Sequence, residues 1–439
     1  MKLHYLLFFC ILFWFAPLTL SEAADPSPKE LDEYMALPDD SYGWKIVQKS
    51  EPGGRHVFLV EMTSQTWHEV MWKHYMYIVE PSKMTNPNNC ILFIAGSSIG
   101  REPGNNDRMI AEGLAEMSGS AVAMLFQVPN QPLFGDHRED SLIGETLLKA
   151  IETQDSTWPL LFPMTKSAIR GMDTVQALFK QERAKEIKNF VVSGASKRGW
   201  TSWLTAASQD QRVLAIAPAV INTLNKPKQM EYQMETWGDY SPSIRDYTSR
   251  NLVQDYGDNM PEYQKQLWAM IDPYSYRSRL TVPKLLIHGT NDPYWTVDAT
   301  RWYWDDLEGV KYLLNLPNVG HDLGVHALKG LQTLAVFTRF ACSGQPWPEM
   351  TWKHSEAGDY FVLSVQSDIP AKEAKLWTAQ SETKDFRQAR WVSQPVEGVN
   401  GTYTVSIPKP ASGHIAYYLE LETEFDEIPF SVTTEVWRD

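Results

Sequence analysis

Cysteine is scarce in this chain, which has three cysteines in 439 residues. Cys10, Cys90 and Cys342 lie far apart and lack the paired spacing of a metal site, so we expect no metal. Cys10 would leave with an N-terminal signal. A disulfide between Cys90 and Cys342 and two separate buried thiols both fit the sequence. Nucleotide-binding motifs are missing too, and we expect no cofactor.

Basic stretches are also missing. Lys and Arg total 40 against 54 Asp and Glu, the net charge is −14, and no run of Lys or Arg provides a basic face. A protein that binds nucleic acid uses such a face to release counterions from the phosphates. We therefore expect no nucleic-acid partner, and the acidity favours solubility.

Long apolar runs are confined to the N-terminus. A weakly basic start precedes LHYLLFFCILFWFAPLTL, and the polar segment SEAADPSPKE follows. With small residues near Ala23 and Ala24, this pattern is typical of a secretory signal peptide, here residues 1–24. A transmembrane anchor is the competing interpretation, but the run is of borderline length and Pro17 interrupts it. We expect cleavage, a secreted or periplasmic protein, and no stable membrane anchor afterwards.

Apolar strand patterns alternate with helical patterns over residues 25–344. The strand patterns are CILFIAG, AVAMLFQVP, NFVVSGAS, VLAIAPAV, KLLIHGT and VKYLLNLPN. Helical patterns cover residues 107–117, 141–151, 165–182, 198–208 and 324–340. This alternation predicts an α/β fold with a doubly wound, mostly parallel sheet. Ligands of such sheets bind at the carboxyl ends of the strands.

Two regions break the alternation. Residues 222–279 are polar, look helical and are rich in Tyr, Trp and Met. A peripheral insertion and a cap over the strand ends both fit, and we favour the cap because the insertion leaves the sheet where strands end. After Gly344, QPWPEMTW is a plausible linker. Short strand patterns then predict a small β-sandwich, so that residues 345–439 form a second domain.

A serine stands between a strand and a helix in Gly194-Ala195-Ser196-Lys197-Arg198-Gly199. The pattern resembles the nucleophile elbow G-x-S-x-G, in which small residues let the turn close and leave the serine hydroxyl exposed. The second glycine comes one place late, and Arg198 stands at its usual position. A helix N-cap is the alternative role of Ser196.

A nucleophilic serine needs a base, and the base needs an acid that orients it. In this fold the expected chain order is Ser, acid, His, each after a later strand. Asp292 follows KLLIHGT and His321 follows VKYLLNLPN, so both have the right order and place. As plain structural alternatives, Asp292 would be a turn residue and His321 would cap the next helix. Weaker candidates are Asp298 as the acid and His326 as the base, and we expect His288 to be a buried, hydrogen-bonded histidine.

Acyl transfer also needs donors for the developing oxyanion. We expect the backbone N–H of Lys197 to be one donor and the loop AGSSIG, at Ser97 or Ser98, to supply the other, although plain turn residues fit equally well. The Lys197 side chain would either face the pocket and favour an anionic substrate or lie in solvent. The acidic residues Asp136, Glu139 and Asp140 are candidates for binding a peptide N-terminus, but a solvated acidic turn is the simpler interpretation.

Four sequence blocks carry a resemblance to a known family. They are GASKRGWTSWLTAA, the stretch Gln127–Asp140, the stretch Trp158–Gln176, and LWTAQSETKDFRQARW. Together they resemble the PhoPQ-activated pathogenicity-related family over nearly the whole mature chain. This resemblance implies an exported α/β-hydrolase with an added β-domain, in which the GASKRG form of the elbow is normal. The elbow also resembles the G-x-S-R-x-G turn of glucuronoyl esterases.

These observations lead to two hypotheses. The first is a secreted serine hydrolase that cleaves an ester or amide of a small molecule, a glycan ester or a peptide. Its catalytic residues would be Ser196, Asp292 and His321. The second is a secreted binding or signalling protein on a hydrolase scaffold, because fold does not determine function. Carbohydrate binding through Trp377 and Trp391 is a third interpretation, which core packing explains more simply.

Overall fold

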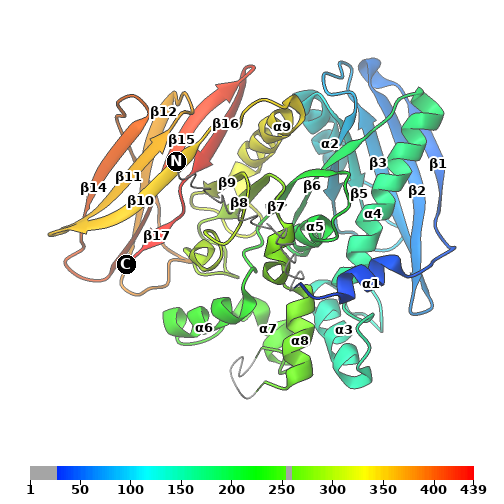
Figure 1. Ribbon diagram of the computed structural model, residues 1–439, viewed down its shortest axis with the longest axis horizontal. Helices are drawn as coiled ribbons and strands as arrows, with labels where there is room; N and C mark the ends of the chain where they lie inside the picture. Colours follow the sequence, from blue (N-terminus) through cyan, green and yellow to red (C-terminus); the bar gives the residue numbers. More distant parts are fainter. Residues whose placement is uncertain (1–26, 254–259) are drawn as a thin grey trace, which may run out of the picture.

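The computed structural model describes residues 27–253 and 260–439 (Figure 1). Its main feature is a sheet with the strand order β1-β2-β3-β5-β4-β6-β7-β8-β9-β16-β15-β12-β13. The first nine strands are β1 (Gly43–Ser50), β2 (His56–Trp67), β3 (Val70–Glu80), β4 (Asn89–Ile94), β5 (Ala121–Leu125), β6 (Asn189–Ala195), β7 (Val213–Ala219), β8 (Lys284–Gly289) and β9 (Lys311–Leu316).

The centre of the sheet is parallel. Strands β5, β4, β6, β7, β8 and β9 pair in this order and in one direction, and they are the six strands that the apolar runs predict. The antiparallel strands β1, β2 and β3 extend one edge. Strand β5 ends at Leu125, earlier than its apolar run, because the chain leaves the sheet at Gln127, whose φ is 58°. The predicted α/β fold is confirmed.

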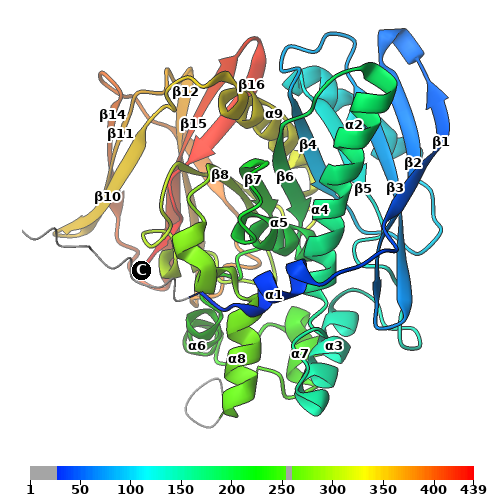
Figure 2. The same ribbon diagram turned by 45° about the vertical axis from the view of Figure 1, so that its right-hand side comes forward.

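Helices cover both faces of the parallel strands (Figures 1 and 2). In β4, Leu92 packs into one hydrophobic cluster and Ile91 into the other, as expected for a strand that is buried on both faces. Figure 2 shows α4 and α5 in front of the sheet and α2 and α9 behind it. The helices of this part are α1 (Glu30–Ala36), α2 (Asn105–Ser118), α3 (Glu139–Thr153), α4 (Leu161–Leu178), α5 (Lys197–Ala207) and α9 (Ala327–Ser343).

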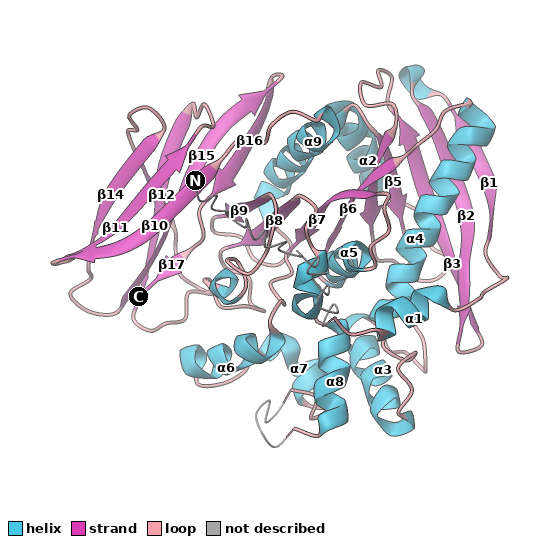
Figure 3. Ribbon diagram, in the orientation of Figure 1, coloured by secondary structure: helices cyan, strands magenta, loops and turns pink. Residues whose placement is uncertain are grey.

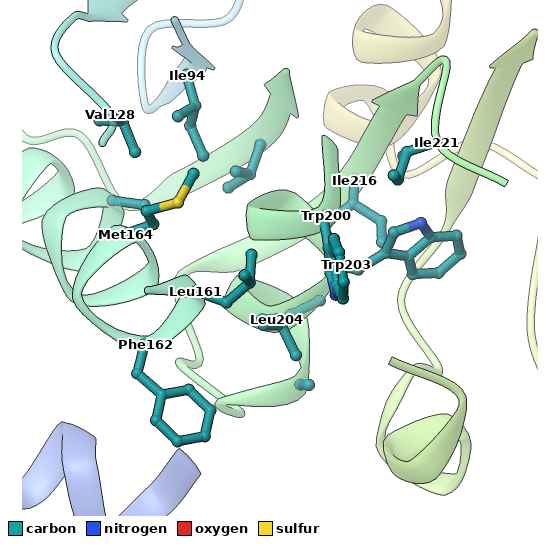
Figure 4. Packing of buried hydrophobic residues seen from close by; sticks show 14 of the residues in the cluster. Ile94, Val128, Leu161, Phe162, Met164, Trp200, Trp203, Leu204, Ile216 and Ile221 are labelled. Carbon is teal, nitrogen blue, oxygen red and sulfur yellow. The ribbon is translucent and has the colours of Figure 1, made fainter. Parts of the chain in front are cut away.

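Helix α5 is buried along its whole length. Figure 4 shows Trp203 and Leu204 of this helix near Leu161 of α4, in the larger of the hydrophobic clusters. Trp200 donates a hydrogen bond from its indole N–H to the carbonyl of Ile271, at 2.6 Å. The helix that follows Ser196 is therefore held between the sheet, α4 and the end of the helical insertion.

The insertion at residues 222–279 folds into helices, as predicted, in the part that the structure describes. These are α6 (Lys226–Trp237), α7 (Arg245–Thr248) and α8 (Glu262–Ile271), with the 3-10 turns η3 (Pro242–Ile244) and η4 (Pro273–Arg279). In Figure 1 they lie with α3 below the sheet. The segment is polar in sequence yet well packed, since Tyr247, Leu267 and Trp268 are buried.

The C-terminal strands form two layers (Figure 3). One is the sheet of β10 (Met350–Ala357), β11 (Tyr360–Ser367) and β14 (Thr402–Pro408). The other contains β12 (Glu373–Ser381), β13 (Val392–Pro395), β15 (His414–Phe425), β16 (Ile428–Thr433) and β17 (Trp437–Arg438). Leu363 of one layer and Tyr417 of the other share a hydrophobic cluster, as in a sandwich. The predicted linker is too long, because β10 begins inside it, at Met350.

The second layer continues the central sheet. Thr433 of β16 pairs with Leu313 of β9, and the buried Asn315 donates from Nδ2 to the carbonyl of Thr434 at 3.0 Å. The C-terminal strands thus extend the central sheet, an arrangement that the short strand patterns of the sequence do not reveal. Trp391, 2% exposed, packs against Tyr418 in this layer, with ring centroids 5.3 Å apart.

Both cysteines in the described part of the chain are free. Cys90 lies in β4 and Cys342 near the end of α9, and burial raises the pKa of both thiols. Of the two arrangements that the sequence allows, the structure has the separate thiols. The predicted signal peptide and Cys10 lie outside the described residues. Within the described residues, none of the helices combines the length and the hydrophobicity needed to cross a bilayer.

Strand β8 ends at a glycine that the neighbouring chain approaches closely. A Cβ atom on Gly289 would lie 2.5 Å from the carbonyl oxygens of Val319 and Gly320. We predict that Gly289→Ala lowers the free energy of unfolding by about 1–3 kcal/mol, because backbone must move to admit the methyl group. The measurement is urea denaturation of both proteins.

Gly330→Ala is the matched control. This glycine lies inside α9, and its added Cβ would meet nothing closer than Ile287 Cγ2 at 3.8 Å. Alanine is the better helix former, so this variant should gain up to about 1 kcal/mol. Equal effects of the two substitutions would contradict the interpretation.

Candidate active site

Ser196 stands at the turn between β6 and α5 with φ 58° and ψ −127°. A non-glycine residue rarely adopts this conformation, which costs about 1–3 kcal/mol and clusters at functional sites. The Ser196 N–H donates to the carbonyl of Ala219 at 2.8 Å, which fixes the turn to β7. The N-cap alternative does not hold, since the Ser196 side chain makes no capping hydrogen bond.

The late glycine of the motif has a packing reason. A Cβ atom on Gly199 would lie 2.6 Å from Ile221 Cγ2 and 2.9 Å from the carbonyl oxygen of Gly194. Gly194 is equally constrained, because its Cβ would lie 2.8 Å from Arg198 Cβ. The first turn of α5 therefore packs directly on the strands, and glycine is required one place later than in G-x-S-x-G.

The structure brings Ser196, His321 and Asp292 together. His321 Nε2 lies 2.8 Å from Ser196 Oγ, and His321 Nδ1 lies 2.8 Å from Asp292 Oδ2. The other carboxylate oxygen of Asp292 accepts the backbone N–H of Tyr294 at 2.9 Å. Asp292 is 7% exposed, and the Tyr294 ring lies 4.4 Å from the His321 ring. This geometry fits proton transfer from the serine to a histidine that is oriented by a buried carboxylate.

The weaker candidates lie elsewhere. Asp298 is 1% exposed and accepts hydrogen bonds from Tyr232 and Arg301, away from the serine. His288 is buried in β8, where burial lowers the pKa of its ring to about 4. We expected the His288 ring to be hydrogen-bonded, but its Nε2 has no hydrogen-bond partner in the described part of the chain. His326 lies in the 3-10 turn η6 (Gly324–His326), after the His321 loop.

Arg198 joins the elbow to the loop between β5 and α3. Its Nε donates to the carbonyl of Val128 at 2.6 Å, and its two terminal nitrogens bind both oxygens of Glu139 at 2.7 and 2.8 Å. Burial would raise the pKa of Glu139, but the hydrogen bonds and charge of Arg198 outweigh it and hold that pKa well below its ordinary range. Arginine at this position, where glycine is usual, forms a planar, bidentate ion pair with the Glu139 carboxylate.

The side chain of Lys197 is 7% exposed, so the alternative that it lies in solvent is wrong. Its Nζ lies 2.9 Å from Glu139 Oε2 and 3.6 Å from Asp140 Oδ2. Asp140 also accepts hydrogen bonds from the hydroxyl groups of Tyr247 at 2.9 Å and Tyr294 at 3.2 Å. Glu139 and Asp140 are therefore engaged within the protein, in contrast to the solvated turn that the sequence suggested. Asp136 does lie in solvent, with its side chain 85% exposed.

The loop after β4, which carries Ser97 and Ser98, contacts the guanidinium of Arg198. A Cβ atom on Gly96 would lie 2.1 Å from a terminal nitrogen of Arg198. Ser98 Oγ accepts a hydrogen bond from Arg138 at 2.9 Å, and the Ser98 carbonyl accepts one from Gln127. Ser97 and Ser98 are partly buried. The small cavity beside Ser196 is lined by Lys197 but, within the described ranges, by neither of these serines.

The cavity beside Ser196 has a volume of about 20 Å³. Residues of the insertion form part of its wall, which places the insertion over the strand ends as a cap. The lining residues are Asp140, Ser196, Lys197, Trp200, Ile221, Lys226, Ile244, Tyr247, Tyr294, Trp295 and His321. Lys226, Tyr294 and Trp295 are functional candidates that sequence reasoning missed, because nothing in the local pattern links them to Ser196.

Two asparagines attach the acid and histidine loops to the C-terminal layer. Asn291 donates from Nδ2 to the carbonyls of Arg387 at 3.2 Å and Ala389 at 2.8 Å. Asn318 donates to the Trp391 carbonyl at 3.0 Å and accepts the Trp391 N–H at 2.8 Å. We call these contacts the asparagine clamp. Its receiving segment, FRQARW, belongs to a block that carries the family resemblance, which was the only signal in the sequence.

Comparisons with known proteins agree with this architecture. The family model described as PhoPQ-activated pathogenicity-related protein matches residues 31–387. Autocrine proliferation repressor protein A of Dictyostelium discoideum is 33% identical over 463 residues, covering 95% of this chain and 92% of that protein.

Solved structures with a similar fold include esterases. An acetyl xylan esterase from Paenibacillus sp. R4 has a TM-score of 0.50 and 14% identity, over 72% of this chain and 91% of that one. Acetyl xylan esterase 1 from Thermoanaerobacterium sp. JW/SL YS485 has a TM-score of 0.47 and 15% identity, over 70% and 94%. At this identity the likeness shows the fold alone. The chain has the α/β-hydrolase fold and belongs to the PhoPQ-activated pathogenicity-related protein family.

Proposed function

We propose that the protein is a serine hydrolase that cleaves an ester or amide bond through an acyl-enzyme. The observation that carries this proposal is the pair of 2.8 Å contacts that link Ser196, His321 and Asp292 at a strained strand-to-helix turn. A protein that only binds a ligand does not require this arrangement. The esterase fold of the structural neighbours is in agreement.

In this mechanism Ser196 Oγ attacks the carbonyl carbon of the substrate. His321 Nε2 accepts the hydroxyl proton and then donates it to the leaving alcohol or amine. Asp292 holds the ring in the required orientation and stabilises its positive charge. Water, activated by His321, then attacks the acyl carbon and releases the acid, which regenerates Ser196.

The oxyanion needs preorganised donors. The Lys197 N–H is the first of α5, where a backbone N–H has no acceptor within its own helix. It can therefore donate to an oxygen that develops beside Ser196. A second donor from Ser97 or Ser98 stays a prediction.

Export is part of the proposal and rests on the signal-peptide pattern of residues 1–24. We propose a secreted or periplasmic enzyme whose substrate is a small molecule, a glycan ester or a peptide.

A second candidate function is binding or signalling without turnover. The observation in its favour is the name of a relative, a proliferation repressor that is 33% identical to this chain. That name describes a regulatory effect and is silent about chemistry.

The first test is labelling of the purified mature protein with a fluorophosphonate probe. We predict that the parent protein is labelled and that Ser196→Ala is not, because only a serine whose hydroxyl is activated by His321 attacks the phosphorus. The readout is the intact mass of each protein after incubation. A folded parent that remains unlabelled would contradict the hydrolase proposal and favour the binding function.

The asparagine clamp provides a second test. We predict that Asn291→Ala slows labelling of Ser196 by about tenfold to a hundredfold, because it frees the loop that carries Asp292. Asn88→Ala is the matched control, since Asn88 is exposed and its side chain makes no hydrogen bond to the described residues. Labelling rates of both variants are compared with that of the parent at equal protein concentration. Equal rates in all three proteins would mean that the clamp has no part in positioning Asp292.

A further inference from the structure

Lys226 is a buried cation without an ionic partner in the wall of the active-site cavity. It begins α6, is 3% exposed and lines the cavity together with Ser196 and His321. Its Nζ lies 5.7, 5.1 and 5.4 Å from the ring centroids of Tyr247, Trp268 and Trp295. Among the described residues, no oxygen accepts a hydrogen bond from Nζ and no carboxylate lies at ion-pair distance.

The other charges around Ser196 are already matched. Lys197 and Arg198 balance Glu139 and Asp140 through direct contacts. The two phenols that donate to Asp140 stay neutral, since burial, followed by the charge of Asp140, raises the pKa of both tyrosines. These four charges sum to zero, and neither of the two carboxylates lies within ion-pair distance of Lys226 Nζ.

Asp272 is the nearest candidate for a counter-charge, but its oxygens are used elsewhere. One accepts the backbone N–H of Lys226 at 2.7 Å, and the other accepts the backbone N–H of Tyr274 at 2.9 Å. Burial lowers the pKa of Lys226 to about 8, and the charges of Asp272 and Asp140 oppose this shift. Three aromatic rings surround Nζ, and such rings attract a cation but accept no strong hydrogen bond.

A buried ammonium that lacks a hydrogen-bond acceptor is costly, and an anion in the cavity would remove that cost. The cavity is small, about 20 Å³, where one water molecule needs about 10–15 Å³. A space of this size limits an occupant to a few atoms, so an anion that binds there has to be compact.

We propose that Lys226 anchors an anion subsite beside Ser196 and that the substrate carries a compact carboxylate which binds there. The statement about the substrate rests on the proposed hydrolase function, whereas the subsite can be tested without turnover. The carboxylate would accept hydrogen bonds from Nζ and would lie against the aromatic rings that surround it. Recognition of this kind selects acidic ester or amide substrates over neutral analogues of the same shape.

The test is a titration of the unreactive Ser196→Ala variant with propionate and with the neutral propionamide. Intrinsic tryptophan fluorescence is the readout, because Trp268 and Trp295 flank Nζ. We expect saturable binding of propionate, at least tenfold tighter than that of propionamide. Adding Lys226→Met to this variant should weaken propionate binding at least tenfold.

Lys166→Met, in the same Ser196→Ala background, is the matched control. Lys166 is another buried lysine near an aromatic ring, with Nζ 5.5 Å from the Tyr34 ring centroid, but it lies in α4 and donates to the Leu37 carbonyl. The double variant Ser196→Ala, Lys166→Met should bind propionate with the same affinity as the single variant Ser196→Ala. Far-UV circular dichroism shows whether each variant folds, and if Lys226→Met does not, the comparison of propionate with propionamide decides alone.

Equal affinity for propionate and propionamide would overturn the subsite, as would undiminished propionate binding by a folded Lys226→Met protein. These outcomes are separate from those of the labelling experiment. Propionate selectivity in a protein whose serine is not labelled would retain the subsite and reject the hydrolase. Labelling without propionate selectivity would retain the hydrolase and reject the subsite.

Discussion

The backbone conformation of Ser196 is the constraint around which the surrounding structure is built. A serine at φ 58° and ψ −127° costs about 1–3 kcal/mol, so neighbouring contacts have to hold it there. The buried helix α5, the bond from the Ser196 N–H to the Ala219 carbonyl, and the tight packing at Gly199 supply those contacts. They leave the hydroxyl as the part of the residue that faces His321.

Arg198 extends this constraint to the loop before α3. A guanidinium that is bonded to Val128 and Glu139 ties together the elbow and a loop that lies about sixty residues earlier. The same link brings Asp140 to the cavity wall, where it binds two tyrosines and neutralises Lys197. Because these charges satisfy one another, Lys226 on the cap is the lysine of the cavity wall that makes no ion pair with any residue that the structure describes.

The C-terminal layer is in direct contact with the central sheet and with two loops of the candidate active site. It continues the central sheet through β16 and holds the acid and histidine loops through the asparagine clamp. A loop that carries one catalytic group of a triad has to be positioned to within a fraction of an ångström. Asn291 and Asn318 bond to main-chain atoms of a segment whose two ends, Phe386 and Trp391, are buried, and such bonds serve that need better than contacts between flexible side chains would.

The sequence by itself determined the six parallel strands, the helices between them and the order of Ser196, Asp292 and His321. Periodicity and turn residues encode such features locally, and the fold rules place residues that follow strands at one edge of a sheet. Only the tertiary structure decided the bidentate ion pair between Arg198 and Glu139, the burial of Lys197, the asparagine clamp and the aromatic surroundings of Lys226. Each of these depends on distances between segments that are remote in the chain. Packing sets those distances, and no local pattern of residues records them.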